Sequence, residues 1–338
     1  MELSEVLMEL SRANGVSGDE TGAAATARRY LTPLVDETRI TPLGNLVGIR
    51  RCDDPEAKTV LLDAHLDQVG LIVTGQKDGM LTFTGGVGGV DDRMLPGHTV
   101  AVLTEPVSYG VIGWNRETPE DKPVPRTEML IDCGLTEAEA KQIPVGTRIA
   151  YATGPWSRGN RVFGKSLDNR SCFLALLRAL ELVKDEKLRV HVAVLGSVQE
   201  ETGGLGALTG TYEAEPEIAY VTDVTFGDSP DSQKGFPLGS GAAIGFSPVL
   251  DRRLSRRLCA LADQEDIPYV REAMSGSTGT NSMHTQIAGK GVPTVLVSLP
   301  LRYMHTPVEE IDLRDVEAVA RLTAAFLRSL DGEDLEWL

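Results

Sequence analysis

The amino-acid sequence predicts an α/β fold in which a small all-β segment interrupts a larger α/β domain. Buried-strand patterns alternate with helix patterns before residue 70 and again after residue 160. Between these flanks, short β-type runs are separated by Gly and Pro turns, and helix patterns are nearly absent. The 338 residues suffice for two domains, but neither flank alone has enough strands for a convincing sheet. We therefore expect residues 1–70 and 161–338 to form one α/β domain, with residues 71–160 inserted as a β domain.

The first flank begins with two helix patterns and ends in a strand. An amphipathic pattern at the start of the chain places Val6, Leu7 and Leu10 on one side of a helix. Residues 20–37 form a second helix pattern, rich in Ala and Arg. The continuous apolar run Thr59–Ala64 is typical of a strand that is buried on both faces.

The insert and the second flank differ in the elements that they predict. The insert suggests a barrel or sandwich of short strands, with one short helix at Thr136–Gln142 and β-type runs at Leu71–Val73, Leu81–Thr84, Thr99–Leu103, Tyr109–Ile112, Met129–Ile131 and Thr147–Tyr151. The second flank alternates, with helices at 171–184, 250–265 and 314–330 and strands at 189–195, 217–222 and 293–298. Such alternation indicates a largely parallel sheet layered with helices.

Composition and charge exclude several classes of protein. With 41% apolar and 24% charged residues, the chain has the composition of a folded protein rather than a disordered one. The net charge of −16 should repel phosphate backbones, so we expect no nucleic-acid partner. No run of 18 apolar residues occurs, so we expect no membrane partner either.

The cysteines and the first residues suggest a cellular compartment. The start of the chain lacks the basic region and apolar block of a signal peptide. The four cysteines are scattered without a CxxC pair, which argues against a disulfide framework and against a thiolate metal site. We therefore expect a cytoplasmic protein.

Acidic residues and histidines concentrate in five short stretches, four of which directly follow a predicted buried strand. The stretches are AHLDQVG (64–70), GKSLDNR (164–170), SVQEETGG (197–204), TDVT (222–225) and RYMHTPVEE (302–310). In open α/β sheets, ligands bind beyond the carboxyl ends of the strands. Segments that are distant in sequence are therefore expected to converge on one crevice.

The chemistry of that crevice points to metal ions. Several carboxylates cannot stay ionised together without a counter-charge, and no basic cluster is nearby. Imidazole and carboxylate ligands suit zinc, cobalt or manganese. The number of acids predicts two divalent ions that share a bridging carboxylate and activate a water for hydrolysis. The residues expected in the crevice are His65, Asp67, Asp168, Glu200, Glu201, Asp223 and His305.

Spacing within two of the stretches suggests a division of roles. Glu200 and Glu201 are neighbours after a strand and point in opposite directions, so one can bind metal while the other acts as general base. His65 and Asp67 are two residues apart and point the same way in an extended segment. His65 can bind metal while Asp67 orients it from close by.

Each motif also has a purely structural interpretation, and some candidates are left out for that reason. A lone HxD or a Glu pair is more often structural, and only the coincidence of five stretches favours a site. Asp91–Asp92–Arg93 lies in a Gly-rich turn of the insert and is interpreted as turn chemistry. His98 and His191 are interpreted as structural, and His284 is not included in the site.

The five stretches, together with GGVDDRMLPG, GVIG, GTN, GVPT and RYMHTPVE, resemble the M42 family of dinuclear metallo-aminopeptidases over nearly the whole chain. The resemblance implies hydrolysis of N-terminal residues from peptides. In this family pattern Asp168 bridges the ions, His65 and Glu201 bind one of them, and Asp223 and His305 bind the other. Glu200 is then the general base, with Asp67 as its catalytic companion.

The resemblance also implies a zinc-peptidase-like α/β/α sandwich with an inserted barrel or PDZ-like β domain. That insert would mediate self-association into a homododecamer built from dimers. Three positions depart from the family pattern. Asn169 and Asn281 stand where Asp is common, and Leu205 stands where the family pattern Val-Gly-Leu-Arg-Gly-Ala after Glu201 has Arg. None of the three is a predicted metal ligand.

Three other functions are compatible with the residues. A carboxypeptidase or deacylase of related fold would use the same kind of metal site. A glucanase needs two carboxyl groups about 5–9.5 Å apart on either side of a sugar bond, which adjacent Glu residues do not easily provide. A non-catalytic assembly protein would keep only the association surfaces, and the complete ligand set argues against it.

Overall fold

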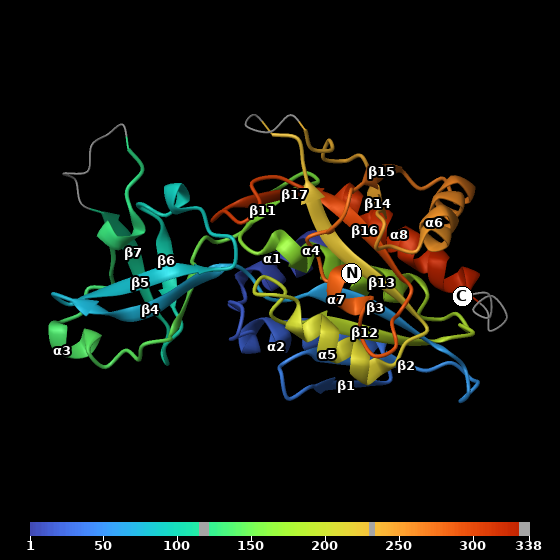
Figure 1. Cartoon of the computed structure of the whole chain (residues 1–338), viewed down its shortest axis with the longest axis horizontal. Helices are drawn as coiled ribbons and strands as arrows, with labels where there is room; N and C mark the ends of the chain where they lie inside the picture. The colour runs from blue at the N-terminus through green and yellow to red at the C-terminus, as the bar shows by residue number, and fades with distance from the viewer. Residues whose placement is uncertain (115–121, 230–233, 331–338) are drawn as a thin grey trace.

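The computed structural model describes residues 1–114, 122–229 and 234–330. Figure 1 shows two bodies, a larger one in which helices cover a sheet and a smaller one made mainly of strands. The predicted α/β fold with a β insert is confirmed.

An eight-stranded sheet forms the centre of the larger body. Its strands, in spatial order, are β1 (Glu37–Ile40), β2 (Leu46–Arg50), β12 (His191–Ser197), β3 (Thr59–His65), β13 (Ile218–Phe226), β16 (Thr294–Leu301), β14 (Ala242–Phe246) and β15 (Tyr269–Ala273). The four central strands, β12, β3, β13 and β16, are mutually parallel. Their carboxyl ends therefore lie at one edge of the sheet, where a crevice is expected.

Helices cover both faces of this sheet. One face packs against α1 (Leu3–Arg12), α2 (Thr21–Leu31), α4 (Leu167–Leu182), α6 (Arg252–Gln264) and α8 (Leu313–Ser329) in a large apolar core. The other face packs against α5 (Leu205–Ala214) and the short α7 (Ser282–Thr285). Alternating residues of the buried strands supply both cores, which explains their continuous apolar runs.

The smaller body is a closed six-stranded barrel, which is one of the two architectures, barrel or sandwich, that the sequence predicts. Its strands are β4 (Gly70–Lys77), β5 (Met80–Val87), β8 (Met129–Asp132), β7 (Ser108–Trp114), β6 (Thr99–Val102) and β9 (Arg148–Tyr151), in the order of pairing. The barrel has its own apolar core, which includes Leu71, Leu81 and Ile131. Helix α3 (Glu137–Ala140) begins at a capping box formed by Thr136 and Glu139.

The chain returns from the barrel to the larger body through a small three-stranded sheet. Strands β10 (Trp156–Arg158), β11 (Arg161–Gly164) and β17 (Glu309–Asp312) pair in antiparallel fashion. Because β3 ends at His65 and β4 starts at Gly70, the chain also enters the barrel directly beside the carboxyl edge of the main sheet. Both connections therefore lie close to the predicted crevice.

The sequence patterns located only the four central strands of the main sheet, and its outer strands differ from the expectation. The predicted helix 20–37 ends at Leu31, because Pro33 has no N–H group to continue the helix. The chain then forms a 3-10 turn at Thr32–Leu34 and the edge strand β1. The opposite edge strand, β15, is only partly buried and so carries no apolar run to reveal it.

Two further expectations can be compared with the structure. Within the described residues, no helix combines the length and the apolar character that crossing a bilayer requires. All four cysteines are free thiols.

Candidate metal centre

The main sheet and its loops bring the predicted residues to one edge. His65 is the last residue of β3, and Glu200 and Glu201 lie just beyond the end of β12. Asp223 lies within β13, which runs further than expected, to Phe226. His305 follows β16 in a loop. The parallel arrangement visible in Figure 1 thus gathers side chains from separate parts of the chain.

Asp168 lies between the two histidines. It is at the start of α4, where the backbone at Asp168 and Asn169 is not yet helical, and it is 5% exposed. Its Oδ1 is 3.2 Å from Nε2 of His65, and its Oδ2 is 3.3 Å from Nε2 of His305. One carboxylate therefore faces both imidazoles.

The other acids divide between these two histidines. Asp223 Oδ1 lies 3.7 Å from His65 Nε2, and Glu201 Oε2 lies 3.3 Å from His305 Nε2. The potential ligand atoms thus form two groups with Asp168 in common, His65–Asp168–Asp223 and Asp168–Glu201–His305. The pairing implied by the family resemblance, His65 with Glu201 and Asp223 with His305, is therefore wrong for this structure. The direction of each side chain decides the grouping, and the sequence does not give it.

Both imidazole rings have one nitrogen engaged by a backbone carbonyl. His65 Nδ1 is 3.2 Å from the carbonyl oxygen of Asp67, and His305 Nδ1 is 3.1 Å from that of Gly89. A carbonyl oxygen can only accept a hydrogen bond, so Nδ1 is the protonated nitrogen in the neutral ring. Nε2 then turns a lone pair toward the carboxylates, which is the arrangement of a metal-binding histidine.

Gly89 shows that the insert takes part in the site. Its carbonyl, at the end of a Gly-rich segment that follows β5, accepts the hydrogen bond of His305. A Cβ atom at this position would lie 2.7 Å from Nδ1 of His305. Only glycine allows the segment to approach so closely.

Asp67 supports both glutamates as well as His65. It is fully buried, and its Oδ1 is 3.4 Å from Nδ1 of His65. Its two oxygens accept the backbone N–H groups of Glu200, at 3.0 Å, and Glu201, at 3.1 Å. One carboxylate thus fixes the loop after β12 relative to the end of β3.

Glu309 is a site residue that sequence reasoning did not identify. It is 2% exposed, and its carboxylate accepts the backbone N–H groups of Asp168, at 3.1 Å, and His305, at 2.9 Å. It therefore holds the backbones of two potential ligands. The stretch RYMHTPVEE contains Glu309, but its burial depends on pairing of β17 with β11, which no local pattern reveals.

The acids of the site are held in an environment that disfavours their charge. Burial raises the pKa of Glu200 to about 7 and that of Glu309 to about 8. Burial also raises the pKa values of Glu201 and Asp223 well above the ordinary carboxyl range, and the charge of Asp168 adds to the effect for Glu201. These carboxyl groups require nearby positive charge in order to ionise.

The histidines respond in the opposite sense. Burial disfavours the charged ring of His305, but Asp168 and Glu201 outweigh it and raise its pKa to about 10. His65 is also buried, and the carboxylates of Asp168 and Asp67 raise its pKa well above the ordinary value. Without another cation, protons must supply the positive charge that the carboxylates demand.

The donor set fits divalent cations. The buried Oδ1 of Asp168 accepts no hydrogen bond of acceptable geometry from the described residues, although Nε2 of His65 is near. Nitrogen lone pairs and carboxylate oxygens that converge in this way are the donor set of a metal ion, which replaces the protons that otherwise lie between them. Imidazole and carboxylate together suit zinc, cobalt and manganese.

Two of the three departures from the family pattern have a structural explanation. Asn169 is buried and donates through Nδ2 to the carbonyl of Thr222 at 2.8 Å, which Asp could not do. Asn281 donates through Nδ2 to Ser197 Oγ at 2.8 Å, and that hydroxyl donates to buried Asp63. Leu205 is 47% exposed, and nothing in the structure explains the choice of this side chain.

The residues set aside from the site have other contacts. Asp91 accepts the backbone N–H and the guanidinium of Arg93 at the start of a 3-10 turn, as the turn interpretation predicted. His191 accepts the backbone N–H of Cys52 through Nδ1 at 3.1 Å. His98 lies in the barrel segment before β6, and His284 lies on α7, outside both ligand groups.

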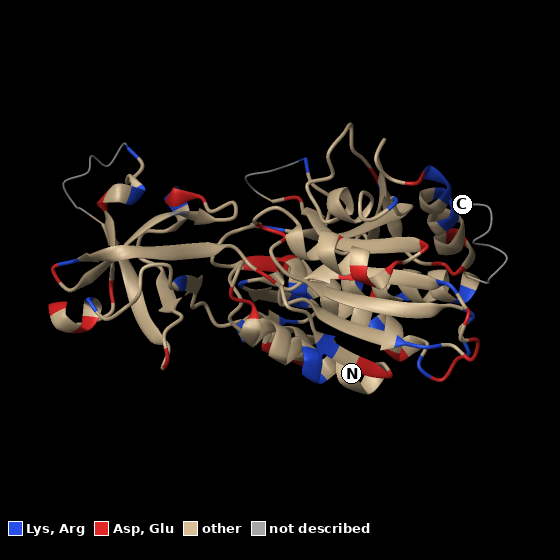
Figure 2. Ribbon diagram, turned by 60° about the horizontal axis from the view of Figure 1, so that its bottom comes forward, with Lys and Arg blue, Asp and Glu red and all other residues tan. Residues whose placement is uncertain are grey.

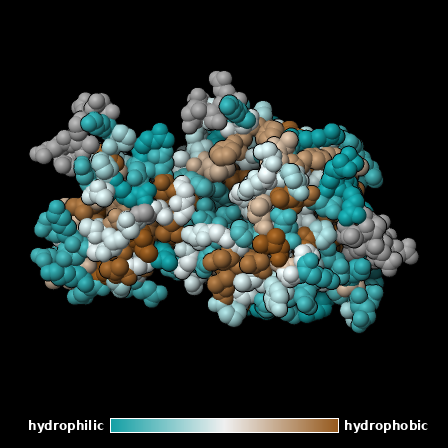
Figure 3. Space-filling view, viewed as in Figure 1, coloured by the Kyte–Doolittle hydropathy of each residue, from teal (hydrophilic) through white to brown (hydrophobic). Residues whose placement is uncertain are grey.

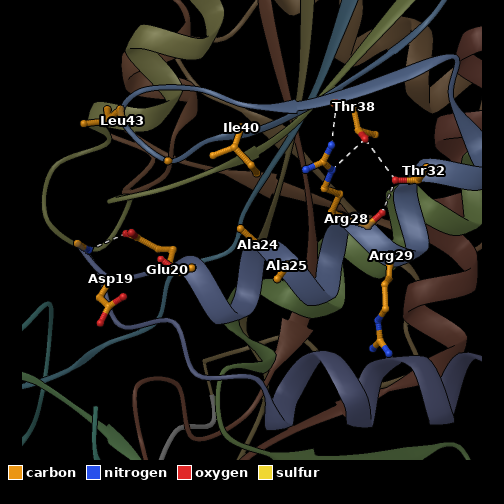
Figure 4. Close-up of a pocket in the computed structure, with 13 residues that line it drawn as sticks. Asp19, Glu20, Ala24, Ala25, Arg28, Arg29, Thr32, Thr38, Ile40 and Leu43 are labelled. Carbon is orange, nitrogen blue, oxygen red and sulfur yellow. Dashed lines mark hydrogen bonds between the residues drawn. The ribbon is translucent and has the colours of Figure 1, made fainter. Parts of the chain in front are cut away.

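A cavity of about 640 Å³ opens at the ligand groups and includes Glu200 in its wall. Another cavity, of about 690 Å³, lies along α2 and contains none of the predicted site residues. Figure 4 shows Glu20 at one end of that second cavity. The Glu20 carboxylate accepts the N–H groups of Gly18 and Gln199, and Gln199 directly precedes Glu200. Glu20 therefore braces the same loop from behind.

An α/β sheet with two histidine–carboxylate groups that share one aspartate at its carboxyl edge defines a metal-dependent hydrolase. Known proteins narrow this class. A family model described as M42 glutamyl aminopeptidase matches residues 44–322. The lysyl aminopeptidase of Pyrococcus furiosus is 30% identical over 345 residues, which cover 98% of both chains.

Solved structures agree with this family match. An aminopeptidase from the archaeon Desulfurococcus kamchatkensis is similar with a TM-score of 0.92 at 30% identity, covering 99% of this chain and 97% of that chain. The TET1 peptidase of Pyrococcus horikoshii is similar with a TM-score of 0.85 at 27% identity, covering 97% and 100%. The chain belongs to the M42 aminopeptidase family, and it is a metal-dependent hydrolase of peptide bonds.

The raised pKa values predict that the metal-free protein loses stability as the pH rises. Folding raises the pKa of Glu200 from 4.5 to about 7, that of Glu309 from 4.5 to about 8, and that of His305 from 6.5 to about 10. Between the two values of each group, the folded state keeps a proton that the unfolded chain has released. The unfolded chain releases these protons earlier, so the free energy of unfolding falls as the pH rises through this window. Thermal unfolding of chelator-treated protein between pH 5 and pH 9 measures the effect.

The metal-loaded protein is the control for this titration. A bound cation replaces the protons, so added zinc or cobalt should raise the melting temperature most at the alkaline end. A metal-free protein whose melting temperature rises from pH 5 to pH 9 would contradict this description of the site.

Proposed function

We propose that the chain removes N-terminal residues from peptides with two divalent ions, zinc, cobalt or manganese, bound at the two ligand groups. The observation that carries this proposal is the position of Asp168, which presents Oδ1 to His65 and Oδ2 to His305. A carboxylate that faces two groups in this way is suited to bridge two ions. His65 and Asp223 complete one group, and Glu201 and His305 complete the other.

When bound, such a pair of ions polarises the scissile carbonyl and lowers the pKa of the attacking water. Glu200 serves as the general base. Its carboxylate lines the cavity, belongs to neither ligand group and has an Oε2 atom 3.9 Å from His65 Nε2. It takes the proton of the attacking water and then transfers that proton to the leaving amine.

Asp67 acts through its neighbours rather than on the substrate. It orients the His65 ring and, through the backbone of Glu200, fixes the position of the base. This arrangement keeps Glu200 and Glu201 in separate roles, because the same carboxylate anchors both backbones while their side chains face different histidines.

Replacement of Glu200 by Gln tests the proton transfer. We expect kcat for aminoacyl-p-nitroanilides to fall by about 100-fold or more, because the amide cannot take the proton. Metal content measured by elemental analysis should stay unchanged, because Glu200 lies outside both ligand groups. A variant that retains substantial kcat would rule out Glu200 as the base.

The substrate control separates an aminopeptidase from a deacylase. Wild-type protein should hydrolyse a substrate with a free α-amine and leave its N-acetylated counterpart intact.

Glu213→Gln is the matched control for the Glu200 variant. Glu213 is an exposed residue of α5 that pairs with Arg39 away from the site, so its replacement should leave activity unchanged.

We also propose that the insert, residues 71–160, mediates self-association into a homododecamer built from dimers. A peptidase of Pyrococcus horikoshii with this fold is described as assembling into a tetrahedron or an octahedral shell. In this chain β7 exposes three large apolar side chains, with Tyr109 67%, Val111 44% and Trp114 45% exposed. Figure 3 shows hydrophobic residues on the surface of the barrel. Exposed apolar patches of this kind mark association surfaces.

Replacement of Val111 by Asp tests this assembly surface. We expect the particle mass, measured by light scattering, to fall to that of small species, because a carboxylate cannot be buried in an apolar contact without a partner. Tyr212→Asp, on the exposed face of α5, is the control and should leave the mass unchanged. A full-size particle with Val111→Asp would exclude β7 from the interface.

The cytoplasm is the compartment that we propose. The four free cysteines support it, since thiols persist in a reducing environment.

A further inference from the structure

The cavity at the ligand groups is also lined by residues that belong to neither ligand group. They come from β13, from β16 and from the end of β15 with the residue that follows it. These residues are Thr225, Phe226, Glu272, Met274, Leu296 and Ser298. A peptide whose first carbonyl lies at the ligand groups would place its first side chain against these walls.

Strand β13 determines where Thr225 lies relative to the ligand Asp223. It pairs with β16 in an uninterrupted register from Ala219 to Phe226, so Asp223 and Thr225 point to the same face. Two residues along a strand span about 7 Å. Asp223 faces His65, and Thr225 therefore lies one step farther into the cavity.

Glu272 contacts Thr225 at this step and has no cationic partner among the residues that the structure describes. Glu272 reaches from β15 and accepts a hydrogen bond from the hydroxyl of Thr225 through Oε1. Among the described residues, Glu272 forms no ion pair, and no Lys or Arg side chain lines the cavity. Its Oε2 atom remains available to a ligand. Placing an unpaired carboxylate in a substrate cavity is costly unless the substrate brings the opposite charge.

Part of the wall of the same cavity is apolar. Leu296 and Met274 pack together with Val221 and Leu250 in a small apolar cluster beneath the cavity. An aliphatic stem can lie on this surface while its charged end reaches Glu272. The extended Lys side chain spans about 6 Å from Cα to Nζ, so its ammonium group can bind away from the α-carbon of the residue.

We propose that this part of the cavity binds the side chain of the substrate's N-terminal residue and selects Lys or Arg through Glu272. The inference rests on the proposed function, because it takes the ligand groups as the place of the scissile bond. An N-terminal Asp or Glu is disfavoured, because its carboxylate would face Glu272 and no Lys or Arg of the described residues lines the cavity to neutralise either group. A neutral aliphatic residue fits the apolar wall but leaves Glu272 unpaired.

Aminoacyl-p-nitroanilides test this selection on the full-length, metal-loaded protein. We expect kcat/KM for the Lys and Arg substrates to exceed that for Leu by about 10-fold or more, with the Glu substrate poorest. Glu272→Gln should lower kcat/KM for Lys and Arg by about 10- to 100-fold and change that for Leu by less than about threefold. Metal content and melting temperature should match those of the wild type.

Two further variants complete the experiment. Glu272→Lys should lose the Lys substrate and gain the Glu substrate, because it reverses the charge of the cavity wall. Glu265→Gln, an exposed substitution at the end of α6, should leave the ranking of substrates unchanged.

Specific results would overturn the inference. A wild-type preference for Leu or Glu over Lys contradicts it without any variant. An equal loss with every substrate in Glu272→Gln also contradicts it, because Glu272 would then bind the α-ammonium common to all of them. Failure to hydrolyse any substrate with any of the three metals refutes the proposed function itself, which is a different result from a wrong ranking.

Discussion

The shared carboxylate of Asp168 is the contact on which the site depends. It is buried, it faces Nε2 of both His65 and His305, and it belongs to both groups of potential ligands. The two histidines outweigh burial and hold its pKa well below the ordinary range. The remaining acids cannot ionise beside it without added positive charge, and this constraint makes the edge of the sheet a place for cations.

The fold keeps that arrangement rigid through backbone contacts. Asp67 anchors the loop after β12, and Glu309 anchors the backbones of Asp168 and His305. The carbonyl of Gly89 orients His305 from the barrel side. The insert is therefore tied to the chemistry of the larger body, and a change in the barrel position would reach the histidine ring.

The large negative charge has a limited meaning for this site. Figure 2 shows acidic positions spread over both bodies of the molecule, so the site accounts for only a part of the net charge of −16. The distribution of charged side chains within the cavity is more informative about ligands than the net charge. Glu272 and the ligand acids line one cavity that holds no Lys or Arg side chain from the described residues, and such a cleft attracts cationic groups.

Much of this organisation could be predicted from the sequence, because buried parallel strands have continuous apolar runs and their ends point to one edge. His65 and His305 were identifiable by their place after such runs, whereas Asp168 lies in a stretch that leads into a predicted helix. The edge strands β1 and β15 were missed because partly exposed strands lack that signal. Strands β2 and β14 were missed although they are largely buried, because each is only five residues long and contains a glycine. Glu309 was missed because its burial depends on strand pairing, and the grouping of the ligands depends on side-chain directions.

The metal content of the wild type and of Asp168→Ala shows whether two ions share this carboxylate. After removal of loosely bound metal, elemental analysis should find two equivalents of zinc, cobalt or manganese per wild-type chain. Asp168→Ala should hold fewer than one, because both groups lose the ligand that they share. A folded Asp168→Ala protein that retains two equivalents, or a wild type that never binds more than one, would contradict the account.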